Sequence, residues 1–111
     1  MKPKIEDIFC EEIIPGKSKV IVVSESSRDI AFEHTAPSHD VHIVVAPKKH
    51  IASIVDLLRY PLTAQQLMTT VTRIAKTLEA KHGACRIISN VGDYQDSNHL
   101  CFEIVFGEIK R

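Results

Sequence analysis

The sequence predicts an α+β domain in which one long helix packs on a mostly antiparallel sheet of about five strands. Residues 63–82 carry a stripe of apolar side chains at helical spacing, and short runs rich in β-branched residues lie before and after them. The chain has 111 residues, which is enough for one hydrophobic core. We therefore expect a single domain spanning residues 1–111.

The first part of the chain predicts a short helix and three strands. Residues 4–13 place apolar side chains at helical spacing and Pro15-Gly16 ends this run, so we expect a short N-terminal helix. Residues 19–25 and 29–33 are typical of two strands joined by a hairpin. Residues 40–47 predict the third strand, which ends at its proline because proline has no N–H for the ladder.

The middle of the chain predicts the long helix. A short helical or irregular piece at 51–58 precedes it. Thr63 and Gln66 have the spacing of a capping box, and Gly83 suits the residue that follows a helix C-terminus. We therefore expect the helix to span residues 63–82.

The last part of the chain predicts two more strands, at 85–90 and 99–107. In the second of them polar and apolar side chains alternate, so one face of the strand meets the core. The other face carries His99, Cys101 and Glu103.

The composition argues against several classes of partner. The chain has 14 Lys and Arg residues against 14 Asp and Glu, and its longest basic cluster is Lys48-Lys49, so we expect no nucleic-acid binding. No segment approaches the length of a membrane span or a signal peptide, so we expect no membrane partner and a cytoplasmic location. The three cysteines lack C-x-x-C spacing and are expected to be free thiols.

The candidate site consists of His99, Cys101 and Glu103 together with His42, which interrupts an otherwise apolar strand. Imidazole, thiol and carboxylate groups can perform acid–base, nucleophilic or metal chemistry. The same pattern also fits a solvated strand face and a core histidine with satisfied nitrogens. Spacing alone does not decide between these interpretations.

Three segments of the chain together resemble the histidine-triad (HIT) family of nucleotide hydrolases and transferases. Residues 22–51, with His42 and the Pro-Lys-Lys-His-Ile exit at 47–51, resemble the family's hairpin and central strand. Residues 83–92 resemble its Gly-x-Arg…Asn-x-Gly strand, and the final segment takes the place of the His-φ-His-φ-His-φ-φ motif. The resemblance implies a HIT-like fold and a homodimer in which the 85–90 strands and the long helices of two subunits meet.

The motif itself departs from the family. Cys101 occupies the position of the histidine that attacks the α-phosphate and forms a nucleotidyl-enzyme intermediate. His99 and His42 match the histidines that orient the site, and Glu103 stands where the third histidine contacts phosphate. The resemblance makes these four the candidate catalytic residues, and whether the chain is an enzyme stays open.

The resemblance also implies nucleotide-binding positions. Asn90 belongs to the Asn-x-Gly segment, and Gln95 keeps the glutamine that helps to hold the phosphate. His34 stands where the family places an aspartate for the ribose hydroxyls, and Asp96 replaces a small hydroxyl residue. Two unit charges 4 Å apart interact by about 4 kcal/mol at an effective dielectric near 20, so an acid in the phosphate cradle weakens phosphate binding.

These positions predict a divergent HIT protein that binds a purine mononucleotide or phosphoramidate-type molecule, needs no cofactor, and has lost or altered its histidine-based catalysis. Three alternatives remain at this point. One is phosphotransfer by a Cys101 thiolate, and another is a non-catalytic dimeric interaction module. The third is a zinc site made by His42, His99, Cys101 and Glu103.

Overall fold

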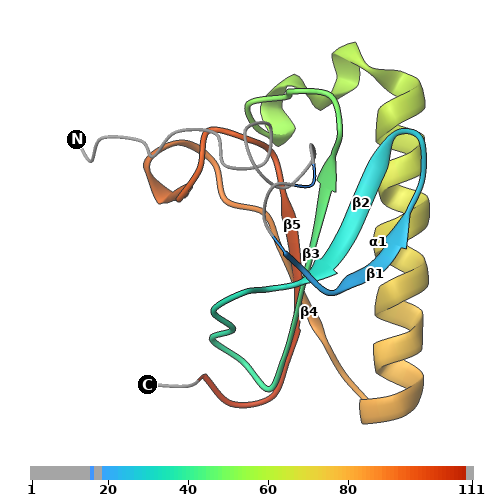
Figure 1. Ribbon diagram of the computed structural model, residues 1–111, viewed down its shortest axis with the longest axis vertical. Helices are drawn as coiled ribbons and strands as arrows, with labels where there is room; N and C mark the ends of the chain where they lie inside the picture. The colour runs from blue at the N-terminus through green and yellow to red at the C-terminus, as the bar shows by residue number, and fades with distance from the viewer. Residues whose placement is uncertain (1–15, 17–18, 110–111) are drawn as a thin grey trace.

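The computed structural model describes Gly16 and residues 19–109, so the helix predicted at 4–13 and the thiol of Cys10 lie outside the described residues. Five strands form one sheet in the order β1-β2-β3-β5-β4, and every neighbouring pair is antiparallel (Figure 1). One long helix packs on this sheet. The predicted α+β architecture is therefore confirmed.

Strand β2 has the predicted bounds, and the other four strands are shorter than the sequence pattern predicts. They are β1 (Val22–Glu25), β2 (Asp29–Glu33), β3 (Val41–Pro47), β4 (Arg86–Ile88) and β5 (Phe102–Phe106). The last strand starts late because the N–H of Leu100 donates to the carbonyl of Ile51, 2.7 Å away, outside the β3–β5 pairing. The residues just before β5 consequently follow their own path toward the site.

The long helix α1 (Pro61–His82) begins two residues earlier than predicted. Pro61 is its first residue, a position where the missing N–H costs nothing and the restricted φ suits a helix. Tyr60 is the N-cap and makes no capping hydrogen bond through its side chain, so the capping box predicted at Thr63 is wrong. Gly83 ends the helix with a φ of 88°, as predicted. Two short 3₁₀ segments, η2 (Ile54–Arg59) and η3 (Gly92–Tyr94), lie outside it.

Helix α1 covers one face of the sheet (Figure 1). Its apolar stripe packs against the inward positions of β3 and β5, and the stripe consists of Leu67, Val71, Ile74 and Leu78. A polar contact crosses the same interface, where the Thr70 hydroxyl donates to the buried Asp29 carboxylate at 2.6 Å. This face is the main core.

The opposite face of the sheet holds a smaller apolar cluster of Ile30, Phe32, Val44 and Ala46, against which Cys101 packs. The loops that follow β2 and β4 lie on this side, away from α1 (Figure 1). Side chains on alternate strand positions therefore meet two different surroundings, the helix on one side and a loop-covered hollow on the other. None of the helices within the described residues is long and apolar enough to cross a membrane.

Candidate functional site

A cavity of about 190 Å³ opens on the face of the sheet opposite α1. Phe32 and Val44 contribute apolar lining from β2 and β3. Most of the residues singled out from the sequence line it as well: His34, Asn90, Gln95, Asp96, His99, Cys101 and Glu103. The chain therefore brings residues from β2, β5 and the loop after β4 to one place.

His42 and Glu103 form a part-buried polar pair across β3 and β5. The Nε2 atom of His42 lies 2.6 Å from Oε1 of Glu103. On the other side of the ring, the backbone N–H of Ser38 donates to Nδ1 at 3.1 Å. Because Nδ1 accepts this bond, the ring proton lies on Nε2 and is donated to the carboxylate. Glu103 is thus held by a neutral imidazole.

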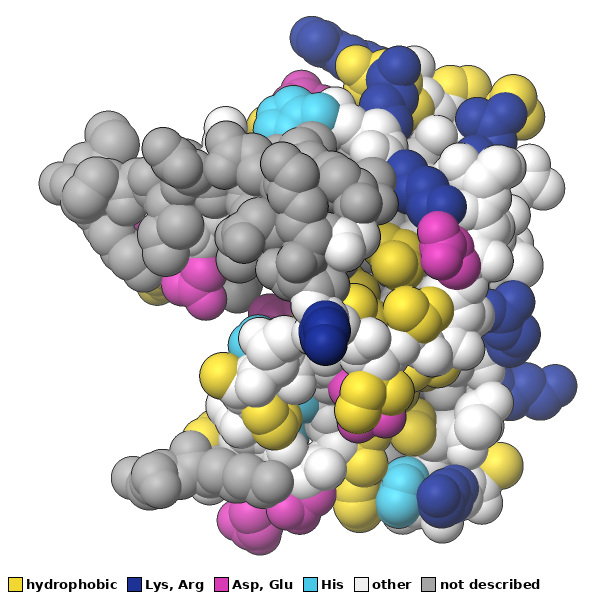
Figure 2. Space-filling model, viewed as in Figure 1, with side chains coloured by type: hydrophobic (Ala, Val, Ile, Leu, Met, Phe, Trp, Pro, Cys, Tyr) yellow, Lys and Arg dark blue, Asp and Glu magenta, His cyan; other side chains and the backbone are white. Residues whose placement is uncertain are grey.

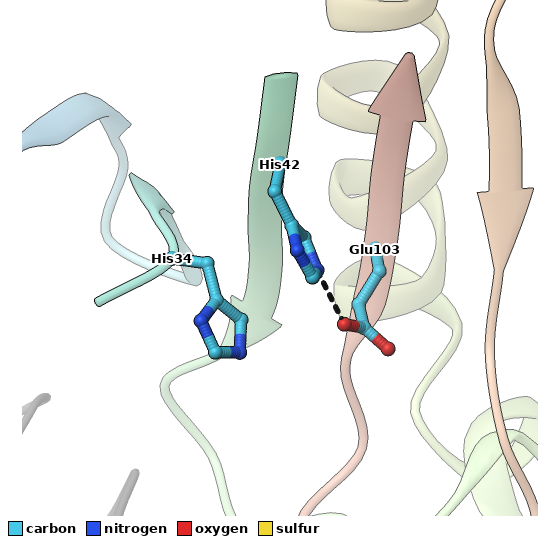
Figure 3. A group of neighbouring side chains, drawn as sticks. All are labelled: His34, His42 and Glu103. Atoms are coloured by element: carbon cyan, nitrogen blue, oxygen red, sulfur yellow. Dashed lines mark hydrogen bonds and ion pairs between the residues drawn. The ribbon is translucent and has the colours of Figure 1, made fainter. Parts of the chain in front are cut away.

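His34 lies beside this pair (Figure 3). Its ring centroid is 4.4 Å from that of His42, and the backbone N–H of Ala36 donates to its Nδ1 at 2.9 Å. The pKa of His34 is lowered chiefly by burial, while Glu103 and Asp96 oppose the shift. His34 therefore stays neutral at neutral pH and adds no positive charge to the cavity.

Cys101 carries a thiol that is strongly disfavoured from ionising. Burial raises its pKa to about 12, and the nearby carboxylates of Glu103 and Asp96 contribute in the same direction. At pH 7 the thiolate fraction is then about one in 100,000. Nucleophilic attack needs the thiolate, so the raised pKa argues against phosphotransfer by this residue.

His99 lines the cavity and is bonded to the end of β3. Its side chain is 1% exposed, and its Nε2–H donates to the carbonyl of Pro47 at 2.8 Å. The ring also meets His50 edge-on, with centroids 5.4 Å apart. His99 therefore ties the segment before β5 to the end of β3.

The model of the HIT domain family matches residues 16–100. The chain belongs to the HIT family. The match ends just before Cys101, so neither that residue nor Glu103 lies within it. A comparison with curated proteins gave no significant match.

Solved HIT structures are similar over nearly the whole chain. A histidine triad protein from Clostridium difficile is 30% identical, with 95% of this chain and 93% of that chain covered and a TM-score of 0.78. A HIT family hydrolase from Legionella pneumophila is 27% identical over 92% and 93% of the two chains, with a TM-score of 0.75. A HIT family hydrolase from Clostridium thermocellum is 25% identical over 91% and 90%, with a TM-score of 0.79. The chain therefore has the fold of HIT family hydrolases.

The metal-ligating groups of this HIT protein come together differently from the set considered for zinc. Within the described part of the chain, potential ligand atoms of His34, His42 and Glu103 lie within 4.8 Å of one another, and neither His99 nor Cys101 belongs to this group. Both of its imidazoles accept a backbone N–H at Nδ1, so each carries its proton on Nε2. A coordinating imidazole has the opposite arrangement, since its metal-bound nitrogen is unprotonated and its other nitrogen donates. This donor set, as arranged, does not suit a metal ion.

Gln95 has a different part from the phosphate contact implied by the family resemblance. Its Oε1 accepts from the N–H of Gly92 at 3.2 Å, and its Nε2 donates to the carbonyl of Ala52 at 2.7 Å. A longer bond of 3.4 Å joins Nε2 to the carbonyl of Ser97. Gln95 therefore shapes the loop that carries Asp96, and it lines the cavity together with Asn90 and Asp96.

Sequence reasoning missed two kinds of residue in this HIT site. Phe32 and Val44 line the cavity, and strand alternation could have found Val44, since it lies two residues from His42 on the same strand. Ser38, which sets the tautomer of His42 through its backbone, lies in a loop whose path no side-chain pattern indicates.

The cavity lining is acidic. Glu103 and Asp96 both line it, and none of the described lining residues is Lys or Arg. Figure 2 shows most of the Lys and Arg side chains of this view over α1 and at the top of the molecule. The charged groups among the described lining residues are therefore both carboxylates.

Proposed function

We propose that this HIT protein binds a nucleotide-like small molecule in the cavity and does not carry out nucleotidyl transfer through residue 101. The observation that carries the proposal is a cavity in which the nucleophile position holds a partly buried thiol with a pKa raised to about 12. A nucleophilic histidine or thiolate is needed for the covalent step. Neither is present at that position.

The cavity suits a small ring system. Its volume of about 190 Å³ corresponds to about six water molecules at about 30 Å³ each. Apolar lining from Phe32 and Val44, with amide, hydroxyl and carboxylate groups around it, is the usual composition of a ligand pocket. A purine or a similar heterocycle is a ligand of this kind.

The proposal includes a homodimer in which β4 and α1 of two copies meet. Among the described residues, strand β4 is the last strand of the sheet and pairs only with β5, so its other edge can pair with another chain. Ile87 on this strand is 50% exposed, which favours burial against a partner. A cytoplasmic location remains part of the proposal and rests on composition.

Binding is tested by thermal denaturation of the full chain with adenosine, guanosine, AMP and GMP. We expect at least one of these probes to raise the melting temperature in a concentration-dependent way, as a ligand of the native state does. If none of the four probes changes the melting temperature, the binding proposal is wrong.

Catalysis is tested with an adenosine phosphoramidate as the substrate. We expect no turnover by the wild-type chain. Cys101→Ser and the control Cys85→Ser, which alters a thiol outside the cavity, separate the possible sources of any activity. Turnover that disappears in Cys101→Ser and persists in Cys85→Ser would show that the thiol is a nucleophile and would refute this part of the proposal.

A further inference from the structure

We propose that the cavity selects an uncharged heterocycle bearing N–H donors, such as a nucleoside, over its phosphorylated form, and that Glu103 accepts hydrogen bonds from those donors. This inference rests on the proposed function and goes further, because it names the part of the ligand that meets the site. It also reverses the expectation that a phosphate lies beside residue 103.

The first step concerns the charge of the His42–Glu103 pair. The N–H of Ser38 points at Nδ1 of His42, so a second proton on that nitrogen would face a donor. In this arrangement the ring proton of His42 lies on Nε2, which donates to Oε1 of Glu103. The pair as a whole carries one negative charge, and its carboxylate lines the cavity.

The second step concerns compensation by neighbouring groups. His34 adjoins the pair, and burial lowers its pKa below the usual value, so its ring is mostly neutral at neutral pH. Asp96 lines the same cavity, and the described lining residues include no Lys or Arg. The charged side chains of the described lining are therefore both acidic.

The third step concerns what such a lining accepts. A phosphate monoester carries about −1.5 to −2 charges at pH 7 and donates few hydrogen bonds. A single like charge 4 Å away weakens binding by up to about 800-fold at an effective dielectric near 20, so a tenfold effect is expected even with strong screening. An N–H donor instead gains a charge-assisted hydrogen bond to the carboxylate.

The fourth step concerns geometry. Only Oε1 of Glu103 takes part in the bond to His42, so Oε2 keeps its lone pairs for a ligand. Phe32 and Val44 offer apolar surface in the same cavity for the face of a flat ring. A ring packed on these two side chains can direct an amino or ring N–H group toward the carboxylate.

The test is isothermal titration of the full chain with adenosine and with AMP. We expect wild type to bind adenosine at least about tenfold more tightly than AMP. In Glu103→Gln, which keeps an acceptor and removes the charge, the preference should fall by about tenfold. The matched control Glu79→Gln removes an exposed carboxylate on α1, outside the cavity, and should leave the ratio unchanged.

A salt series provides a second readout that does not depend on any variant folding. Added NaCl screens like-charge repulsion, so AMP should bind more tightly relative to adenosine as the salt concentration rises.

A further variant tests the second carboxylate of the lining. Asp96→Asn, which alters an exposed side chain, should shift the ratio of the adenosine and AMP affinities in the same direction as Glu103→Gln.

The outcomes separate this inference from the proposed function. AMP that binds wild type as tightly as adenosine, or a ratio that Glu103→Gln and salt both leave unchanged, overturns the inference while ligand binding stands. Absence of binding by adenosine, guanosine, AMP and GMP alike overturns both proposals.

Discussion

Replacing both members of the His42–Glu103 pair should cost less stability than the sum of the two single replacements. In Glu103→Leu the Nε2–H of His42 loses its acceptor at a side chain that is only 5% exposed. A hydrogen bond to a charged group contributes about 1.5–3 kcal/mol, and a buried donor left without a partner costs about 1–3 kcal/mol. We expect Glu103→Leu to lower the free energy of unfolding by about 2–3 kcal/mol.

The partner substitution should be milder. In His42→Leu the carboxylate of Glu103 keeps access to water, since its side chain is 23% exposed. We expect His42→Leu to lower the free energy of unfolding by about 1–2 kcal/mol. The double variant should lose less than the sum of the two single losses, and the difference is a coupling energy of about 1–2 kcal/mol. Urea unfolding of wild type, both single variants and the double variant measures this coupling.

The exposed ion pair of Lys48 and Glu25 provides the matched control. Water and salt screen it, so the same four-variant measurement should give a coupling below about 1 kcal/mol. A coupling at His42 and Glu103 within about 0.3 kcal/mol of zero, or one no larger than that of the surface pair, would refute the description of a buried, directed hydrogen bond.

Three further predictions follow from single residues. Because the pKa of Cys101 is raised to about 12, iodoacetamide should modify it at pH 8 at least about 100-fold more slowly than a free cysteine of pKa near 8.5. The rate of modification should rise with pH, and peptide mapping by mass spectrometry measures it. His34 binds protons less readily in the folded chain than in the unfolded chain, so its contribution to stability is present above pH 6.5 and is lost as the pH falls below that value. In His34→Gln the melting temperature should therefore fall less on acidification than it does in wild type. An unchanged dependence of the melting temperature on pH would contradict this. Leu67→Ala, at a fully buried position of α1, should cost about 2–5 kcal/mol in urea unfolding, and a cost below about 1 kcal/mol would show that the helix packs loosely there.

Local periodicity was sufficient to predict the sheet and the helix. The alternation in 40–47 separated Ile43 and Val45, which pack under α1, from His42 and Val44 on the site face. The start of the helix was wrong because two local signals competed. Pro at the first helical position began the helix before the threonine that resembled an N-cap.

The site could be located from sequence but its contacts could not. His99, Cys101 and Glu103 look equivalent as alternate residues of one strand, yet the structure gives each a different surrounding. His99 donates to the carbonyl of Pro47, Cys101 packs on an apolar cluster, and Glu103 accepts a hydrogen bond from His42. These differences arise because the strand begins only at Phe102, and because hydrogen bonds from distant backbone groups orient the rings.

The residues at 101 and 103 are linked by electrostatics, and this linkage explains why they are best considered together. Glu103 helps to raise the pKa of Cys101, so the acid that pairs with His42 also suppresses the thiolate. Conversely, ionising the thiol would place a second negative charge beside a carboxylate in a site with little water. A carboxylate at 103 and a nucleophilic thiolate at 101 therefore oppose each other, whereas a carboxylate and a protonated thiol are compatible. The carboxylate of Glu103, which lines the cavity, can accept a hydrogen bond from a ligand, and this is the property that the proposed binding of an N–H donor requires.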